Sequence, residues 1–98
     1  MSRHFVVRAE ARLELLEATD WYTERSRDVG AEFVRVVDEA FELIQNSPLR
    51  FPIVDDPVRM AVVRPFPYTI LFTADEDEVV ILSVFHARRD PRRWKRRT

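Results

Sequence analysis

The sequence has no cysteine, and it contains one glycine and one lysine in 98 residues. Without cysteine it has neither disulfides nor thiolate metal sites, and nothing points to an oxidising compartment. The apolar run at residues 5–7 is much shorter than the roughly 7–15 residues of a secretory signal or the roughly 20 of a membrane span. These absences predict a cytoplasmic protein that is not attached to a membrane.

Several chemical motifs are also missing. No Cys, His, Asp and Glu cluster has the spacing of a metal site, and no glycine-rich loop is present to hold a nucleotide phosphate. No serine–histidine–aspartate set is present either. The sequence therefore implies no metal and no cofactor. It also shows no internal repeat, low-complexity segment or linker, so residues 1–98 are expected to form one small domain.

Charge is plentiful but unevenly distributed. Residues 1–86 contain nine arginines and sixteen acidic residues, a net of −7, whereas residues 87–98 contain seven basic residues and one acidic residue, a net of +6. A hydrophobic share of 46% supplies enough apolar residues for a folded core. The basic tail, residues 87–98, is expected to meet an acidic partner or the acidic helices of the protein itself.

Two stretches have the apolar spacing of helices. In the first, from residue 9, the apolar stripe consists of Ala11, Leu15, Ala18 and Tyr22, with Leu16 and Thr19 beside it. The acidic residues expected elsewhere on this helix are Glu10, Glu14, Glu17 and Glu24. In the second, which begins near residue 31, the stripe consists of Phe33, Val37, Ala40, Phe41 and Ile44. Residues 28–30 are expected to break the chain between the helices, and Asn46-Ser47-Pro48 to end the second.

Four segments read as strands, at residues 4–7, 58–64, 68–73 and 79–85. Residues 52–57 are expected to be a loop. The last strand is almost entirely apolar, which indicates an interior strand covered on both faces. The predicted fold is α+β in the order β-α-α-β-β-β, with an antiparallel helical hairpin packed on one face of a small, mainly antiparallel sheet.

The candidate site residues gather at the end of the last strand. A histidine in water has a pKa of about 6.5, which suits proton transfer near neutral pH, so His86 could act as a general acid or base; alternatively, its ring nitrogens cap backbone groups at the strand end. Arg88 and Arg89 follow and present planar donors to phosphate or carboxylate. The alternative for this pair is contact with the protein's own acids, such as Glu10 or Glu14.

Three further residues are candidates for a site or a contact surface. Arg59 and Arg64 lie five residues apart on one predicted strand, so they should point to opposite faces of the sheet. At most one of them can then share a surface with the arginines that follow His86. Trp94 is a large apolar side chain in a basic tail, which predicts that it docks on this protein's sheet or on a partner.

Four segments, in order along the chain, resemble the RelE/ParE toxins of bacterial type II toxin–antitoxin systems. The first is Ala11, Leu15, Glu17, Ala18 and Trp21-Tyr22 in the first helix, and the second is Asn46-Ser47-Pro48. The third is residues 64–72, which begin Arg64-Pro65-Phe66-Pro67-Tyr68, and the fourth is residues 79–94, which include Phe85-His86-Ala87-Arg88-Arg89. The resemblance covers nearly the whole chain and is to the ParE-like, plasmid-stabilisation type. It implies the fold predicted above, growth arrest as the effect, and a hetero-oligomer with a cognate antitoxin.

The superfamily contains two activities. RelE-like members cleave messenger RNA on the ribosome, whereas ParE-like members inhibit DNA gyrase by binding it. For a nuclease, the resemblance and the chemistry of phosphate transfer point to His86 as acid or base and to Arg64, Arg88 and Arg89 as the charged groups.

The sequence favours gyrase inhibition over RNA cleavage. It has a single lysine, no tyrosine after Tyr68, and a pI of about 6.1, whereas binding to a ribosome depends on many phosphate contacts. A ribosome-dependent endonuclease acting on messenger RNA is the alternative. The residues expected to contact the target or the antitoxin are Arg88, Arg89, Arg92, Arg93 and Trp94.

Overall fold

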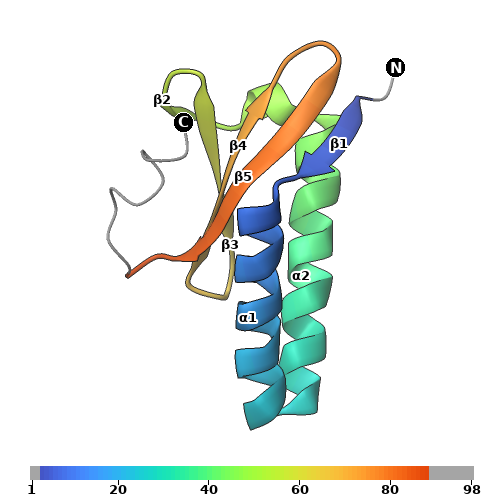
Figure 1. Cartoon of the computed structure of the whole chain (residues 1–98), viewed down its shortest axis with the longest axis vertical. Coiled ribbons are helices and arrows are strands. Elements are labelled where there is room, and N and C mark those ends of the chain that lie inside the picture. Colours follow the sequence, from blue (N-terminus) through green and yellow to red (C-terminus); the bar gives the residue numbers. More distant parts are fainter. Residues whose placement is uncertain (1–2, 89–98) are drawn as a thin grey trace.

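The computed structural model describes residues 3–88. In this part of the chain, a helical hairpin covers one face of a five-stranded sheet (Figure 1). The helices are α1 (Ala9–Arg25) and α2 (Arg27–Asn46), and the strands are β1 (His4–Val7), β2 (Ile53–Asp55), β3 (Val58–Val63), β4 (Tyr68–Ala74) and β5 (Glu78–His86). A 3-10 turn, η1 (Pro48–Arg50), follows α2. The α+β class and the hairpin on one face of the sheet are confirmed.

The strand order in the sheet is β1-β5-β4-β3-β2. β1 pairs with β5 in parallel, and the other pairs are antiparallel. β5 therefore lies between β1 and β4, in the interior position that its apolar run predicts. β2 is a correction, because residues 52–57 were expected to be a loop. All three residues of β2 are exposed at the sheet edge, so the segment lacks the apolar alternation that identifies a strand.

The break between the helices lies earlier than the expected residues 28–30. α1 ends at Arg25 and α2 begins at Arg27, with Ser26 in an extended conformation between them (φ −165°, ψ 124°). The Ser26 side chain accepts the backbone N–H of Val29 at 3.3 Å, which caps the start of α2. Serine, rather than the later glycine, therefore ends one helix and starts the other.

Gly30 lies inside α2, where it is buried against α1. A Cβ atom placed on this glycine would stand 2.9 Å from the Cα atom of Thr23 and would collide with the Thr23 hydroxyl. The glycine thus permits a close approach of the two helices and does not break one.

The main core lies between the helices and the sheet. α2 contributes Phe33, Val36, Val37 and Ile44, which pack with apolar residues of β3, β4 and β5. α1 contributes two alanines, Ala11 and Ala18. Two expectations for α1 were wrong: Leu16 is 55% exposed, and Glu14 is buried with 7% of its surface exposed. Neither helix in residues 3–88 combines the length and apolarity that crossing a membrane demands.

Candidate functional site

A hollow of about 380 Å³ lies where β5 ends, between α1 and the start of β4. It is lined by Glu17, Ala18, Trp21, Tyr22, Tyr68, His86 and Arg88, and it is called the strand-end pocket below. Its volume falls within the range of roughly 300–1,000 Å³ found for ligand sites in proteins. Two residues expected at the site, His86 and Arg88, are brought together here.

Strand register and helix spacing explain why these residues meet. In the antiparallel pair of β4 and β5, Tyr68 lies directly opposite His86, so both side chains lie on one face of the sheet. That face is the one covered by the helices, because Tyr68 belongs to the core shared with α1 and α2. On α1, positions 17, 18, 21 and 22 fall along one side of the helix and complete the wall.

Two lining residues of the strand-end pocket, Tyr22 and Tyr68, belong to an aromatic cluster. The Tyr22 ring centroid lies 5.1 Å from that of Phe33, 5.0 Å from that of Phe66 and 6.2 Å from that of Tyr68. Tyr68 in turn meets the His86 ring edge to face at 5.3 Å. Such pairs stabilise a fold beyond the area they bury. Three of the four segments that carry the family resemblance therefore converge in one packed cluster.

His86 is held by the backbone at the strand end. Its Nδ1 accepts the backbone N–H of Arg88 at 3.1 Å, and the neighbouring Ala87 N–H donates to the carbonyl of Pro67 at 2.7 Å. This is the capping contact that was one of the two roles expected for His86. With Nδ1 acting as an acceptor, the neutral ring carries its proton on Nε2, so it has no second lone pair with which to take a proton.

The charges of the strand-end pocket are balanced. Glu17 supplies a carboxylate and Arg88 a guanidinium on the same rim. Among residues 3–88, no three His, Cys, Asp or Glu side chains are grouped as a metal site. Burial raises the pKa of Tyr22 above its ordinary value, so this phenol stays neutral near neutral pH. The described pocket can therefore accommodate an apolar or amphipathic group, but it does not concentrate positive charge.

Trp21 is held at the mouth of the pocket. The guanidinium carbon of Arg25 lies 3.5 Å above the centre of its ring, and Arg25 Nη1 donates to the Trp21 carbonyl at 2.8 Å. Half of the Trp21 surface is exposed, at 50%. A stacked cation fixes the orientation of the ring while leaving the other part of its surface available for contact.

The remaining predicted site residues lie elsewhere. Arg64 is exposed in the turn after β3 and does not line the pocket. Arg59 is partly buried in β3, where its Nη1 donates to the carbonyl of Phe51 at 2.7 Å. The other expected contact residues, Arg89, Arg92, Arg93 and Trp94, lie outside the described residues.

The sequence reasoning missed the role of Glu14. Its Oε1 accepts the Ser83 hydroxyl and the Val84 N–H, each at 3.0 Å. Along the same edge of β5, Arg8 N–H donates to the Ile81 carbonyl at the end of β1. Beyond the end of β1, the edge of β5 therefore donates its hydrogen bonds to Glu14, and these bonds link α1 to that strand. Glu14 is thus a buried carboxylate and not the surface acid that the sequence predicts. Positions 11, 14 and 18 do share one helical face, but the charge of Glu14 predicts an exposed side chain.

The comparisons with known proteins agree with this fold. The profile of the ParE toxin of type II toxin–antitoxin system, parDE, matches residues 5–91. Among solved structures, the chromosomal ParDE toxin–antitoxin system from P. aeruginosa contains a chain that is 17% identical, with a TM-score of 0.74 over 86% of this chain and 95% of that chain. No match is found among the curated proteins. The chain belongs to the ParE toxin family of type II toxin–antitoxin systems.

Proposed function

We propose that this chain arrests growth by binding DNA gyrase in the cytoplasm and inhibiting it, without carrying out chemistry on nucleic acid. A cognate antitoxin neutralises it by forming a hetero-oligomer. The observation that carries the proposal is the state of His86 in the strand-end pocket. Its Nδ1 is occupied by the Arg88 N–H, so the neutral ring has no free lone pair to act as a base.

The charge of the pocket supports the same conclusion. Cleavage of RNA through the 2′-hydroxyl needs a base, an acid and a surplus of positive charge around the phosphorus. In the described part of the site, Arg88 is matched by Glu17, which would repel a phosphate, and Arg64 lies outside the pocket. Binding to a protein surface needs a site of complementary shape with some charged contacts, and the strand-end pocket with Arg88 offers both.

The ParE family membership supports an antitoxin as partner, and two features of the chain suggest where it binds. Leu13 and Leu16 of α1 are 58% and 55% exposed, and Trp21 is 50% exposed. Exposed apolar groups gathered on one helix are typical of an interaction surface. The tail residues Arg88, Arg89, Arg92 and Arg93, with Trp94, supply contacts for an acidic segment that folds on the toxin.

A RelE-like endonuclease is the second candidate. One observation favours it, namely that Tyr68, His86 and Arg88 share a single pocket with Glu17. In that case Glu17 would have to act as the base, and His86 as a doubly protonated acid after losing its contact with the Arg88 N–H.

The deciding experiment compares DNA supercoiling by purified gyrase with cleavage of messenger RNA on programmed ribosomes. We expect inhibition of supercoiling and intact RNA. Site-specific RNA cuts with normal supercoiling would establish the nuclease instead. His86→Ala should leave toxicity largely unchanged, because a binding inhibitor moves no proton, whereas a nuclease that uses His86 would slow by roughly 10²–10⁴-fold.

A charge substitution tests the contact surface. Arg88→Ala combined with Arg89→Ala should weaken inhibition. The control Arg50→Ala replaces the exposed last residue of η1 and should leave inhibition unchanged. Thermal melts of each variant show whether the protein is folded. Equal inhibition by all of these proteins would exclude Arg88 and Arg89 from the contact.

The tail's part in antitoxin binding is tested by deletion. Removal of residues 92–98 should weaken binding, and the affinity that is left should depend less on salt concentration, because exposed charges are screened by salt. The measurement is the dissociation constant of full-length and truncated toxin across a salt titration. The same affinity and the same salt slope for both would show that the tail takes no part.

A further inference from the structure

The face of the sheet that carries no helix holds a second group of buried apolar side chains. It consists of Val58, Leu71, Leu82 and Phe85, with Met60 and Val80 packed against it, and it is called the helix-free cluster below. The strand register shows on which face of the sheet this cluster lies. Phe85 pairs with Thr69 and Met60 pairs with Leu71, and these positions alternate along the strands with Tyr68 and Ile70, which face the helices.

The side chains of the helix-free cluster are deeply buried. Val58 and Leu71 are each 1% exposed, Leu82 is 4% exposed and Phe85 is 7% exposed. Val62, near one end of β3, is 48% exposed. Both helices lie on the opposite face, and no helix of residues 3–88 lies over this one (Figure 1). Exposures this low require a second layer above the sheet face, and neither helix supplies it.

The chain that follows β5 starts beside this cluster. Phe85, one of its members, lies three residues before Arg88, the last described residue. Residues 89–98 contain one large apolar side chain, Trp94, six residues further on. Six extended residues reach about 20 Å. The cluster spans three adjacent strands, which lie about 4.8 Å apart and so cover about 10 Å. Trp94 can therefore reach its centre.

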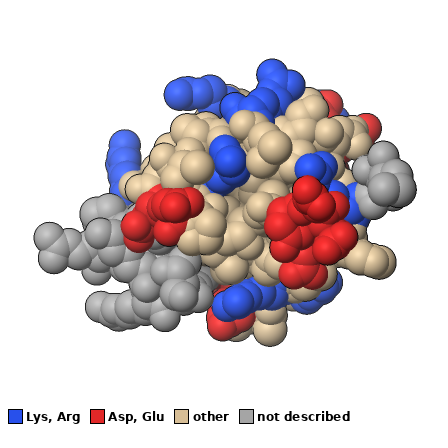
Figure 2. All heavy atoms as spheres, turned by 90° about the horizontal axis from the view of Figure 1, so that it is seen from above, with Lys and Arg blue, Asp and Glu red and all other residues tan. Residues whose placement is uncertain are grey.

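The acidic residues at one end of the sheet are the natural counterpart of the basic residues in the tail. The β2–β3 hairpin carries Asp55 and Asp56, and the β4–β5 hairpin carries four acidic residues at positions 75–78. Both hairpins lie at the end of the sheet opposite His86, because neighbouring antiparallel strands reverse at alternate ends. Figure 2 looks onto this end and shows its acidic side chains gathered in separate groups. Lys95, Arg96 and Arg97 follow Trp94 directly.

We propose that residues 89–98 fold back across the helix-free face of the sheet, with Trp94 seated on Leu71, Leu82 and Phe85. Lys95, Arg96 and Arg97 then lie toward the acidic hairpins. This face is the docking surface for the chain's own tail, and a partner that binds the tail must first draw it away. The proposal holds for the isolated protein, whatever the cellular target.

The test uses Trp94 as its own reporter. Trp21→Phe leaves Trp94 as the single tryptophan of the chain, which has two. We expect blue-shifted emission and quenching by neutral acrylamide that is several-fold weaker than for free N-acetyltryptophanamide. Adding Met60→Gln, a substitution in the helix-free cluster, should raise the quenching toward that of the free compound. The matched control is Leu43→Gln on the outer face of α2, where Leu43 is 49% exposed, and it should change nothing.

Three outcomes would overturn the proposal in a protein whose thermal melt shows it folded. One is full quenching of Trp94 in the Trp21→Phe background, which would mean an exposed tail. Another is equal quenching with Met60→Gln and with Leu43→Gln, which would place Trp94 elsewhere. The third is protection that grows with protein concentration, which would mean docking on a second copy. Replacement of Lys95, Arg96 and Arg97 by Gln should increase quenching at low salt, and no change would refute the contact with the acidic hairpins.

Discussion

The two helices lie side by side against one sheet, but they are attached to it in different ways. α2 presents an apolar stripe whose members Phe33, Val37 and Ile44 are each at most 1% exposed. α1 presents two small alanines and one buried carboxylate, Glu14, which binds the edge of β5. α2 is therefore held mainly by burial of apolar surface, whereas α1 combines the packing of small residues and Tyr22 with the two hydrogen bonds that Glu14 accepts.

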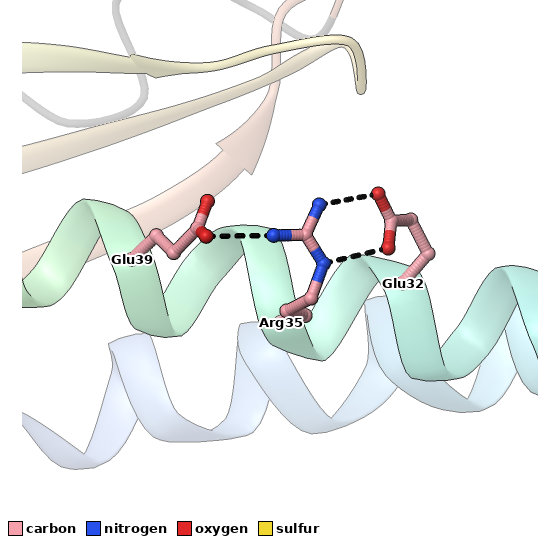
Figure 3. Close-up of polar contacts among 3 residues, drawn as sticks. All are labelled: Glu32, Arg35 and Glu39. Carbon is pink, nitrogen blue, oxygen red and sulfur yellow. Dashed lines mark hydrogen bonds and ion pairs between the residues drawn. The ribbon is translucent and has the colours of Figure 1, made fainter.

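The outer faces of the two helices also differ. On α2, Arg35 bridges two acids: its Nε and Nη2 donate to Glu32 at 2.8 and 2.6 Å, and its Nη1 donates to Glu39 at 2.6 Å (Figure 3). The Arg35 guanidinium also lowers the pKa of Glu32, chiefly through the hydrogen bond. These side chains are about half exposed, so solvent screens both ion pairs and each contributes little to stability. The outer face of α1 instead exposes Leu13 and Leu16, next to a pocket wall.

This difference separates stability from contact with partners. The outer side of α2 carries the ion pairs of Arg35 together with separate exposed apolar side chains such as Val34 and Leu43, and its inner side is the core. α1 supplies four of the seven residues of the strand-end pocket and also carries exposed apolar groups. α1, which buries fewer large side chains than α2, therefore has apolar side chains available for contact with another protein.

The largest effect should come from the core side of α2. Phe33→Ala removes a fully buried ring that contacts Tyr22, Phe66 and Tyr68, and it should lower the free energy of unfolding by about 3–5 kcal/mol. Urea denaturation measures this value. The neighbouring Val34→Ala, at a position 40% exposed, should cost less than about 1 kcal/mol. Similar losses for both variants would contradict the assignment of core and surface on α2.

Removing the polar attachment of α1 should have the next largest effect. Glu14→Ala leaves the Ser83 hydroxyl and the Val84 N–H without their acceptor, which should cost about 2–4 kcal/mol. Glu14→Gln keeps an acceptor oxygen and should recover part of the loss. Glu24→Ala, an exposed acid on the same helix, serves as the control. A Glu14→Ala protein as stable as the control would show that α1 is held by something else.

The contact between the helices should respond to a single methyl group. Gly30→Ala places a Cβ atom against the Thr23 backbone, which cannot swing aside, so the free energy of unfolding should fall by about 1–3 kcal/mol. A loss of stability would be informative, because replacing glycine by alanine within a helix otherwise stabilises it by about 1 kcal/mol. A thermal melt at or above that of the unmodified protein would mean that the helices do not approach closely here.

The smallest effect is a dependence on alkaline pH. Burial raises the pKa of Tyr22, so the folded protein keeps this proton at a pH where the unfolded chain has lost it. The stabilisation is complete below the unfolded pKa of about 10 and is lost as the pH rises through the folded value. Tyr22→Phe should therefore lose less stability between pH 9 and pH 11 in matched urea titrations. An unchanged pH slope would show that Tyr22 does not titrate differently in the folded state.

The sequence by itself determined the α+β class, the order of the elements, the bounds of β1 and the interior place of β5. It also pointed to His86 and Arg88, because both follow a recognisable strand end. These features depend on periodicity and composition within a few neighbouring residues. An apolar run or a helical stripe needs no knowledge of the rest of the chain.

Tertiary structure alone decided the features that depend on partners distant in sequence. Gly30 looks like a helix breaker until Thr23 of the other helix lies against it. Glu14 looks like a surface acid until the edge of β5, about seventy residues away, supplies two donors. β2 became a strand only because β3 offered its edge, and the strand-end pocket appeared only when α1, β4 and β5 met. In each case the free energy that decides the conformation comes from a contact across the fold, and local sequence carries no trace of that contact.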